Sequence, residues 1–275
     1  MKVNLLDKNL RKQFAKWCAA LTGVLSAVLI FIDIPDENRF MAGCIYLVFL
    51  IMLYIICWLI ANNQRKASIK IGNTTVDVKA GDIFAEEGLK AIAFNEYFDT
   101  QVDDVVIAKA SLNGQVITKH IIDVESLDKT ILEDKNLQKN IIADNTQRDM
   151  GKTTKYKLGS SILINDEFVL TAFSRFNENN EAEITIQEYV NFLLSFWNEI
   201  NRLYAQRPVT VPIFGAGITR FKNGFEDIDI NELLQIMIWT FKISKIKFVY
   251  PAKLTILIHE SKIKQVNLYE LKENE

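Results

Sequence analysis

Two long apolar stretches near the N-terminus constrain this chain more than any other feature. The first carries no charged residue from Trp17 to Ile32, and the second carries none from Phe40 to Ala61. A helix needs about 20 apolar residues to cross the hydrocarbon core of a bilayer. The sequence therefore predicts two transmembrane helices, at about 14–34 and 40–61, joined by a short acidic connector in which Pro35 favours a turn.

Basic residues flank the two stretches on their outer sides, and the connector between them is acidic. The flanking residues are Lys2, Lys8, Arg11, Lys12 and Lys16 before the first stretch and Arg65, Lys66 and Lys70 after the second. The positive-inside rule then places both termini in the cytoplasm. A cleaved signal peptide is the alternative interpretation of the first stretch, but no small-residue cleavage site precedes the connector and a second apolar stretch follows directly.

Neither stretch carries a charged residue deep inside it, so no ion or proton path is indicated. A plain anchor and an assembly that perturbs the bilayer both remain open. The cysteines Cys18, Cys44 and Cys57 all lie in the apolar stretches, which leaves none for a disulfide or a thiolate metal site elsewhere. The two histidines, His120 and His259, are far apart, and we expect no metal site.

The charge is distributed unevenly along the chain. Residues 1–70 hold nine Lys/Arg and four Asp/Glu, a net charge of +5, whereas the whole chain has −2 and the remainder therefore −7. An acidic domain repels a polyphosphate backbone, so the composition argues against nucleic-acid binding.

Residues 67–275 alternate between strand and helix patterns, which predicts one α/β domain with a layered sheet. The expected strands are 68–78 (a pair turning at Gly72), 89–94, a hairpin of 155–164 with 167–173, 209–214 and 253–259. The expected helices are 124–136, 185–204, 230–242 and a terminal helix after 261.

Two passages are candidates for chemistry. In Val211-Pro-Ile-Phe-Gly-Ala-Gly-Ile-Thr-Arg220, glycines at a strand end allow backbone N–H groups to turn toward an anion. Taken alone, a Gly-x-Gly step fits a tight turn as well as a phosphate site. In the second passage, Asp82 lies in a Gly-Asp-Ile turn and Asn95 ends the next strand, although an aspartate in a turn often serves only as a cap.

Together, the order and spacing of these passages over residues 69–262 resemble the macro domain, the ADP-ribose-binding α/β module. The resemblance implies a three-layer α/β/α fold with a mixed sheet. It also implies that Asp82 binds the adenine amino group, that Asn95 faces the distal ribose and that the loop after Pro212 holds the diphosphate. The expected ligand-binding residues are Asp82, Ile83, Asn95, Val102, Asp103, Gly215, Ala216, Gly217, Ile218, Thr219, Arg220 and Phe221.

The sequence departs from the family pattern after the strand that ends at Asn95. The first asparagine of the usual Asn-Ala-Ala-Asn run is absent, and residues 98–107 replace the glycine-rich first loop. The missing residues position ribose and water in hydrolytic members, so the resemblance favours binding over hydrolysis, with no catalytic residue and no cofactor. Asp103 and Asp104, near the expected distal end, suggest recognition of an amine-bearing or otherwise modified ADP-ribose.

The two N-terminal helices combined with this divergent macro domain resemble the membrane-anchored effectors of type II Thoeris antiphage systems. That resemblance implies a multi-pass protein of the bacterial inner membrane, with the macro domain in the cytoplasm. A TIR-domain partner would supply an ADP-ribose-derived signal, for this type a histidine conjugate. Binding would drive homo-oligomerisation, and the helices would then disrupt the lipid bilayer in an abortive infection. A membrane-tethered ADP-ribosyl hydrolase and a passive anchored scaffold are the alternatives.

Overall fold

The computed structural model describes residues 3–121, 123–244, 246, 248 and 252–273. Its contacts divide the chain into two units, Met1–Ala67 together with Lys264–Glu275, and Ser68–Ile263. The expected domain boundary at 66/67 lies next to the first division. The C-terminal tail, which the sequence assigns to the second domain, groups with the N-terminal helices instead.

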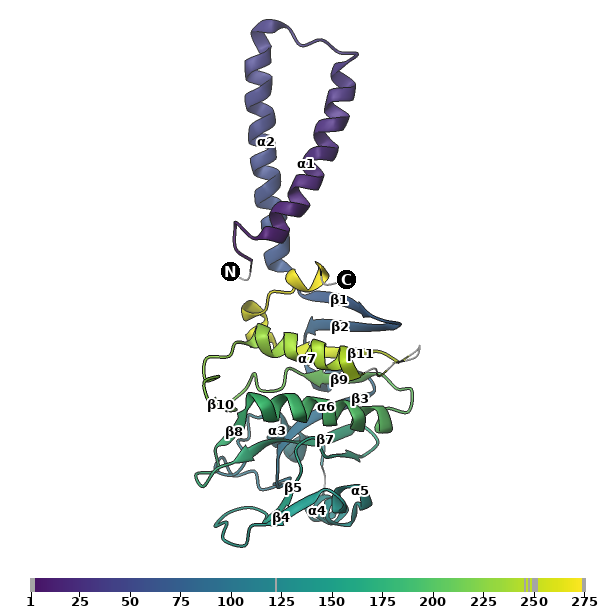
Figure 1. The fold of residues 1–275 in the computed structure, drawn as a ribbon, viewed down its shortest axis with the longest axis vertical. Helices are drawn as coiled ribbons and strands as arrows, with labels where there is room; N and C mark the ends of the chain where they lie inside the picture. The colour runs from purple at the N-terminus through teal and green to yellow at the C-terminus, as the bar shows by residue number, and fades with distance from the viewer. Residues whose placement is uncertain (1–2, 122, 245, 247, 249–251, 274–275) are drawn as a thin grey trace. The chain divides into compact units, whose positions relative to one another are not determined.

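The first unit contains the helices α1 (Lys8–Leu29) and α2 (Asp36–Asn63), which run antiparallel (Figure 1). α1 begins earlier than the apolar stretch predicts because the Asp7 carboxylate caps it by accepting from the N–H groups of Asn9 and Leu10. Among the described helices, α2 is long and apolar enough to cross a membrane, and its side chains are largely exposed. The membrane span of α1 stays a prediction.

The second unit is built on a mixed nine-stranded sheet in the order β1-β2-β11-β9-β3-β7-β8-β10, with β6 paired to β7. The strands are β1 (Lys66–Ile71), β2 (Thr74–Ala80), β3 (Leu89–Asn95), β6 (Ser161–Ile164), β7 (Phe168–Phe176), β8 (Ala182–Thr185), β9 (Val209–Pro212), β10 (Arg220–Lys222) and β11 (Leu254–Ile258). A separate antiparallel pair joins β4 (Ile141–Asp144) and β5 (Thr154–Tyr156).

Helices cover both faces of the sheet, which gives the expected three layers. α6 (Ile186–Leu203) and α7 (Ile230–Ser244) lie side by side on one face, and α3 (Leu112–Lys119) lies behind it (Figure 1). Two shorter helices are α4 (Val124–Glu133) and α5 (Lys135–Gln138). The face toward α6 is aromatic: Phe173, Phe192, Phe196 and Phe214 form a set of stacked and edge-on rings.

Most local predictions are confirmed, with informative exceptions. The hairpin between β6 and β7 turns over residues 165–167, and the two central residues of its β-turn, Asn165 and Asp166, both have positive φ. The helix expected over 124–136 is interrupted at Asp134, whose carboxylate caps α5. The expected terminal helix is wrong, because the tail forms two short 3-10 segments, η2 (Glu260–Gln265) and η3 (Glu270–Glu273).

Candidate functional site

The candidate site lies along one edge of the sheet. β2, β11, β9, β3 and β7 are parallel neighbours in that order, so their carboxyl ends meet at the same edge, where α/β folds bind ligands. Adjacent strands lie about 4.8 Å apart, so the ends of β2 and β3, three strand spacings apart, are about 14 Å from one another. The edge is long enough for an extended ligand.

The loop between β9 and β10, residues 213–219, presents free backbone donors at this edge. Within the described part of the chain, the N–H groups of Gly215, Gly217 and Ile218 donate no hydrogen bond, whereas Ala216 N–H donates to the Ile213 carbonyl at 3.3 Å. Nearly successive N–H groups without partners are a typical concave site for an anion. The phosphate site that the Gly-x-Gly step suggests stays a prediction, to which the unpaired N–H groups of the described loop lend support.

Gly215 is required by packing. Its φ is +83°, and a Cβ built there would lie 2.8 Å from the Phe221 ring. The Tyr189 hydroxyl donates to the Phe214 carbonyl at 3.0 Å, and burial raises the pKa of Tyr189, so this hydroxyl keeps its proton. Gly217, in contrast, has nothing within 4 Å of a built Cβ. Packing against Phe221 therefore requires glycine at position 215, whereas position 217 has free space around it.

The remaining expected residues differ in exposure, since Ile218 and Arg220 are exposed, Thr219 is half-buried and Phe221 is buried. Ile218 is 76% exposed, and Arg220 is held by Glu181 at 2.5 Å across the parallel pair of β10 and β8. Phe221 is buried beside Tyr189 and belongs to the core. In this structure the expected neutralising arginine pairs with a carboxylate.

Asp82 lies at the opposite end of the edge, directly after β2. Its side chain is exposed and caps η1 (Ile83–Ala85) by accepting from Phe84 N–H at 3.0 Å, while Ile83 is buried. Phe84 stacks on His120, with ring centroids 4.8 Å apart and an interplanar angle of 17°. An aromatic pair therefore stands beside the carboxylate that the resemblance assigns to adenine.

Asn95 ends β3, but its polar atoms are occupied inside the protein. It is 3% exposed, its Nδ2 donates to Asp99 at 2.7 Å, and its Oδ1 accepts from the N–H groups of Tyr97 and Asp99. Its side chain holds the segment after β3 in place. Contact with a ribose stays a prediction for this residue.

Behind Asn95 lies a buried ion pair that the sequence did not reveal. Asp99 is bound by both terminal nitrogens of Arg148, at 3.1 and 2.6 Å, and by the N–H of Lys152 at 2.7 Å. The guanidinium stacks over the Tyr97 ring, 4.0 Å from its centroid. Arg148 is 49 residues from Asp99 in sequence, and no local motif links them.

This network borders a cavity of about 310 Å³, lined by Asp99, Thr100, Gln101, Val124, Asp128, Gly151 and Lys152. Lys152 donates from Nζ to the Phe98 carbonyl at 2.7 Å and pairs with Asp128 at 2.6 Å. Burial lowers the pKa of Lys152, although Asp128 opposes the shift. The cavity is thus lined by an ammonium, a carboxylate, a hydroxyl and an amide that are paired with neighbouring groups, since Thr100 Oγ1 donates to Asp128 and Gln101 Nε2 donates to Asp103, each at 2.7 Å.

The other expected residues of this region lie in the segment after the network. Val102 is half-buried, and the Asp103 carboxylate accepts from the N–H groups of Val105 and Val106 at 2.9 and 2.7 Å. These hydrogen bonds, that of Val106 first, lower the pKa of Asp103. Asp103 orders its own loop here.

Glu96, next to Asn95, is a buried carboxyl that sequence reasoning missed. It is 2% exposed, and burial raises its pKa, opposed by Lys155 at 3.1 Å. A perturbed carboxyl at a strand end is a common feature of functional sites and of structural ion pairs. Its only signal in sequence is its place one residue after a predicted strand.

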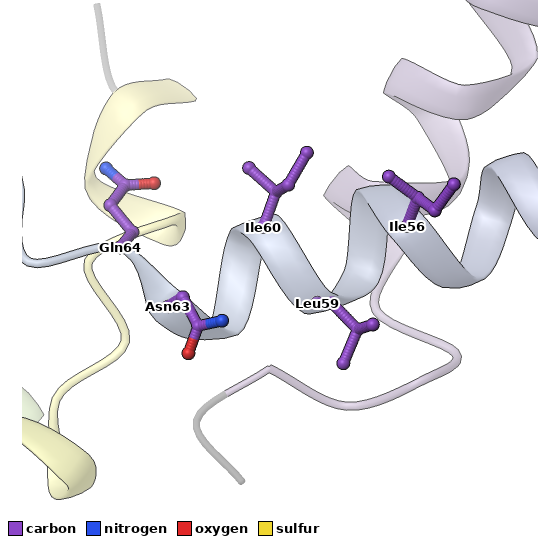
Figure 2. A pocket seen from close by; sticks show the side chains of 5 residues that line it. All are labelled: Ile56, Leu59, Ile60, Asn63 and Gln64. Atoms are coloured by element: carbon purple, nitrogen blue, oxygen red, sulfur yellow. The ribbon is translucent and has the colours of Figure 1, made fainter.

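A second hollow, of about 470 Å³, lies on α2 and is lined by Ile56, Leu59, Ile60, Asn63 and Gln64. Figure 2 shows Ile56 and Ile60 on one side of the helix, with Leu59 and Asn63 on the other. The side chains do not converge on a common point. We regard this hollow as part of the apolar helix surface.

Comparison with known proteins adds a family and a set of similar folds. The family model described as the macro domain of Thoeris protein ThsA matches residues 76–259. A protein of Bacillus amyloliquefaciens (strain Y2) described as Thoeris protein ThsA is 39% identical over 271 residues, covering 96% of this chain and 90% of that protein.

Among solved structures, the Oceanobacillus iheyensis macrodomain is similar at low identity. A variant described with ADPR is 12% identical with a TM-score of 0.47, covering 76% of this chain and 97% of that one. A structure described with ADP is 10% identical with a TM-score of 0.46, covering 76% and 95%.

Proposed function

The chain belongs to the Thoeris ThsA family and carries its macro domain, and on this premise we propose that it is an antiphage effector that senses an ADP-ribose-derived signal. The observation that carries the proposal is the row of free N–H groups at Gly215, Gly217 and Ile218, at the carboxyl end of β9. A diphosphate on this loop would receive several hydrogen bonds from these N–H groups.

The rest of the edge fits the two ends of such a ligand. Toward β2, exposed Asp82 would accept from the adenine amino group, with the Phe84–His120 stack beside it. Toward β3, the cavity with Asp128 and Lys152 would take a polar substituent on the distal ribose. A histidine conjugate of ADP-ribose carries both an ammonium and a carboxylate, which would exchange for the ion pair between Asp128 and Lys152.

Binding is proposed in preference to hydrolysis. A hydrolytic site needs free polar groups to position water at the ribose. Both polar atoms of Asn95 are engaged with Tyr97 and Asp99, and the aspartates of the following loop accept from their own backbone. The tethered hydrolase and the passive scaffold are therefore outcomes to be tested.

The helices are proposed as the output. With α1 and α2 both in the bacterial inner membrane and both termini cytoplasmic, signal binding would drive homo-oligomerisation, and the assembled helices would disrupt the bilayer. A TIR-domain partner would make the signal. The apolar and exposed α2 supports this arrangement, as do the basic flanks of the two helices.

The binding site is tested by adding a negative charge where space is free. Gly217→Glu places a carboxylate over the N–H row without crowding the fold, and we expect it to weaken ADP-ribose binding at least tenfold by calorimetry on the full chain. Tenfold corresponds to about 1.4 kcal/mol. The matched control is Asn191→Glu, an equal charge on an exposed position of α6. Equal affinity of Gly217→Glu and the wild type would refute the site.

The output is tested with the same proteins in dye-loaded vesicles. ADP-ribose and its histidine conjugate should each be compared, and the preferred ligand should raise oligomer size and dye release in the wild type and not in Gly217→Glu. Release of free ADP-ribose from a modified protein would favour the hydrolase. Binding without oligomerisation or dye release would favour the scaffold.

A further inference from the structure

The strand β11 ends in the middle of the proposed ligand edge. It pairs with β2 on one side and β9 on the other, so its last residue, Ile258, lies between the segment that begins at Asp82 and the loop that contains Gly215. The Gly81 N–H donates to the Ile258 carbonyl at 3.0 Å. A ligand that bridges the adenine and diphosphate positions would cross the end of this strand.

From Ile258 the chain passes into the other unit within a few residues. The second unit ends at Ile263, and Lys264 already groups with the helices. The connection is internally tied: Lys262 N–H donates to the His259 carbonyl at 2.8 Å, and His259 Nδ1 and Ser261 Oγ are hydrogen-bonded at 2.8 Å. Residues 259–263 are all that separates the end of β11 from the first residue that groups with the helices.

At its far end the tail is fixed to the helices. Tyr269 packs against the apolar cluster of Val3, Leu10 and Ala61, and its hydroxyl donates to Gln13 of α1. Its neighbour Leu268 is buried, with 1% of its side chain exposed. The tail is therefore an integral part of the helix unit.

The same cluster joins the N-terminal segment to the end of α2. The Trp58 indole N–H donates to the Val3 carbonyl at 2.9 Å, and Asn62 Oδ1 accepts from the Val3 N–H at 3.1 Å. The Tyr54 hydroxyl donates to the Leu5 carbonyl. We call these contacts, together with the packing of Tyr269 against the apolar cluster, the clasp, because they hold the chain before α1 and the tail against the helices.

We propose that residues 259–273 form a coupling strap that transmits occupancy of the ligand edge to the clasp, and through it to the packing of α1 against α2. The inference rests on the proposed function, since it takes the edge as the ligand site and the helices as the output. A ligand shifts a conformational equilibrium only through contacts that differ between the two states. The strap supplies a short physical route for that difference.

The linker between α2 and β1 is the other covalent connection, and it reaches a different part of the sheet. β1 is the outermost strand on this side, beyond β2, whereas β11 lies between the strands that carry the two halves of the proposed ligand site. A displacement of the end of β11 would therefore affect both halves of the proposed ligand site, after β2 and after β9. We therefore assign the transmission to the strap.

The test separates binding from transmission in the full chain. Tyr269→Ala removes the ring from the clasp, Tyr269→Phe removes only the hydroxyl, and Lys264→Ala is the control at an exposed position of the same segment. ADP-ribose affinity, measured by calorimetry, should stay within twofold of wild type in all three, which also shows that the site is folded. Hydrogen exchange with saturating ADP-ribose should change at least threefold in residues 3–13 and 264–273 of the wild type.

For Tyr269→Ala we expect the ligand-induced exchange change to persist at residues 213–219 and to vanish at residues 3–13, with vesicle dye release no longer dependent on ligand. Tyr269→Phe should show a partial loss, and Lys264→Ala should match wild type. If Tyr269→Ala keeps ligand-dependent exchange at 3–13 and ligand-dependent release, the strap is wrong while the proposed function stands. If wild type binds no ADP-ribose derivative, the proposed function fails first, and the strap fails with it.

Discussion

The loop after β9 and the segment after β3 begin at neighbouring strands of one sheet edge, and they use their polar groups in opposite ways. Among the described residues, the N–H groups of Gly215, Gly217 and Ile218 in the loop have no partners, whereas in the segment after β3 Asp99 is bound by both Asn95 and Arg148. The first region is the one that we propose to bind an anion. The second is a scaffold that shapes the cavity beside it.

This difference shows why a motif is insufficient to assign a ligand contact. Asn95 and Gly217 both match positions of the macro-domain pattern; Asn95 ends β3, and Gly217 lies in the loop after β9. Only the geometry of their partners distinguishes a group that is free to bind from a group already satisfied. Breaking each region in turn tests the distinction.

The largest effect is expected at the buried ion pair. Asp99→Ala leaves Arg148, with 8% of its side chain exposed, without its carboxylate partner, and should lower the free energy of unfolding by about 3–5 kcal/mol. The matched control is Glu181→Ala, which removes the carboxylate from Arg220, whose side chain is 57% exposed, and should lower the free energy of unfolding far less because solvent screens this pair. Denaturant unfolding of the full chain in detergent measures both. Equal costs would show that the pair after β3 is not a scaffold.

Substituting each glycine of the loop should distinguish a position where the fold requires glycine, Gly215, from one with free space around it, Gly217. Gly215→Ala forces a Cβ into the Phe221 ring at positive φ and should destabilise by about 1–3 kcal/mol. Gly217→Ala adds its Cβ where nothing lies within 4 Å and should change stability by less than about 0.5 kcal/mol. Thermal unfolding in detergent gives the comparison. A loss of stability in Gly217→Ala would mean that other atoms pack against position 217 and cover the N–H groups of this loop in the folded protein.

The sequence predicts features that depend on neighbouring residues better than features that depend on residues far apart in the chain. The glycine loop and the Asn165-Asp166 turn depend on local conformation, so residue type alone indicates them. The Asp99–Arg148 pair depends on two loops that meet only in the folded sheet. The tail was predicted as a helix because Val266, Leu268 and Leu271 have near-helical spacing, but burial within the helix unit holds it in short 3-10 turns.

Asn95 gives an intermediate effect that sharpens the comparison. Asn95→Ala leaves the N–H groups of Tyr97 and Asp99 and one Asp99 oxygen with fewer partners, and should cost about 1–3 kcal/mol. If Asn95 is scaffold, unfolding free energy and ADP-ribose affinity should fall together. An affinity loss above tenfold at unchanged stability would instead place Asn95 in contact with the ligand, as the resemblance predicts.

The smallest effect concerns the pH dependence set by Glu96. Burial raises the pKa of this carboxyl above its usual 4.5, so the folded state holds the proton more tightly than the unfolded state does. The contribution of Glu96 to the free energy of unfolding is therefore most favourable below about pH 4.5 and decreases as pH rises through the folded pKa.

Glu96→Gln removes this titration while keeping a group that can accept from the Phe176 N–H. We expect its stability relative to wild type to increase as pH rises above about 4.5, as measured by chemical unfolding at half-unit steps from pH 4 to 7. Glu178→Gln, at an exposed position of the turn between β7 and β8, should track wild type throughout. If the difference in unfolding free energy between Glu96→Gln and wild type were constant with pH, the pairing of Glu96 with Lys155 would outweigh its burial. Glu96 would then stay charged in the folded protein.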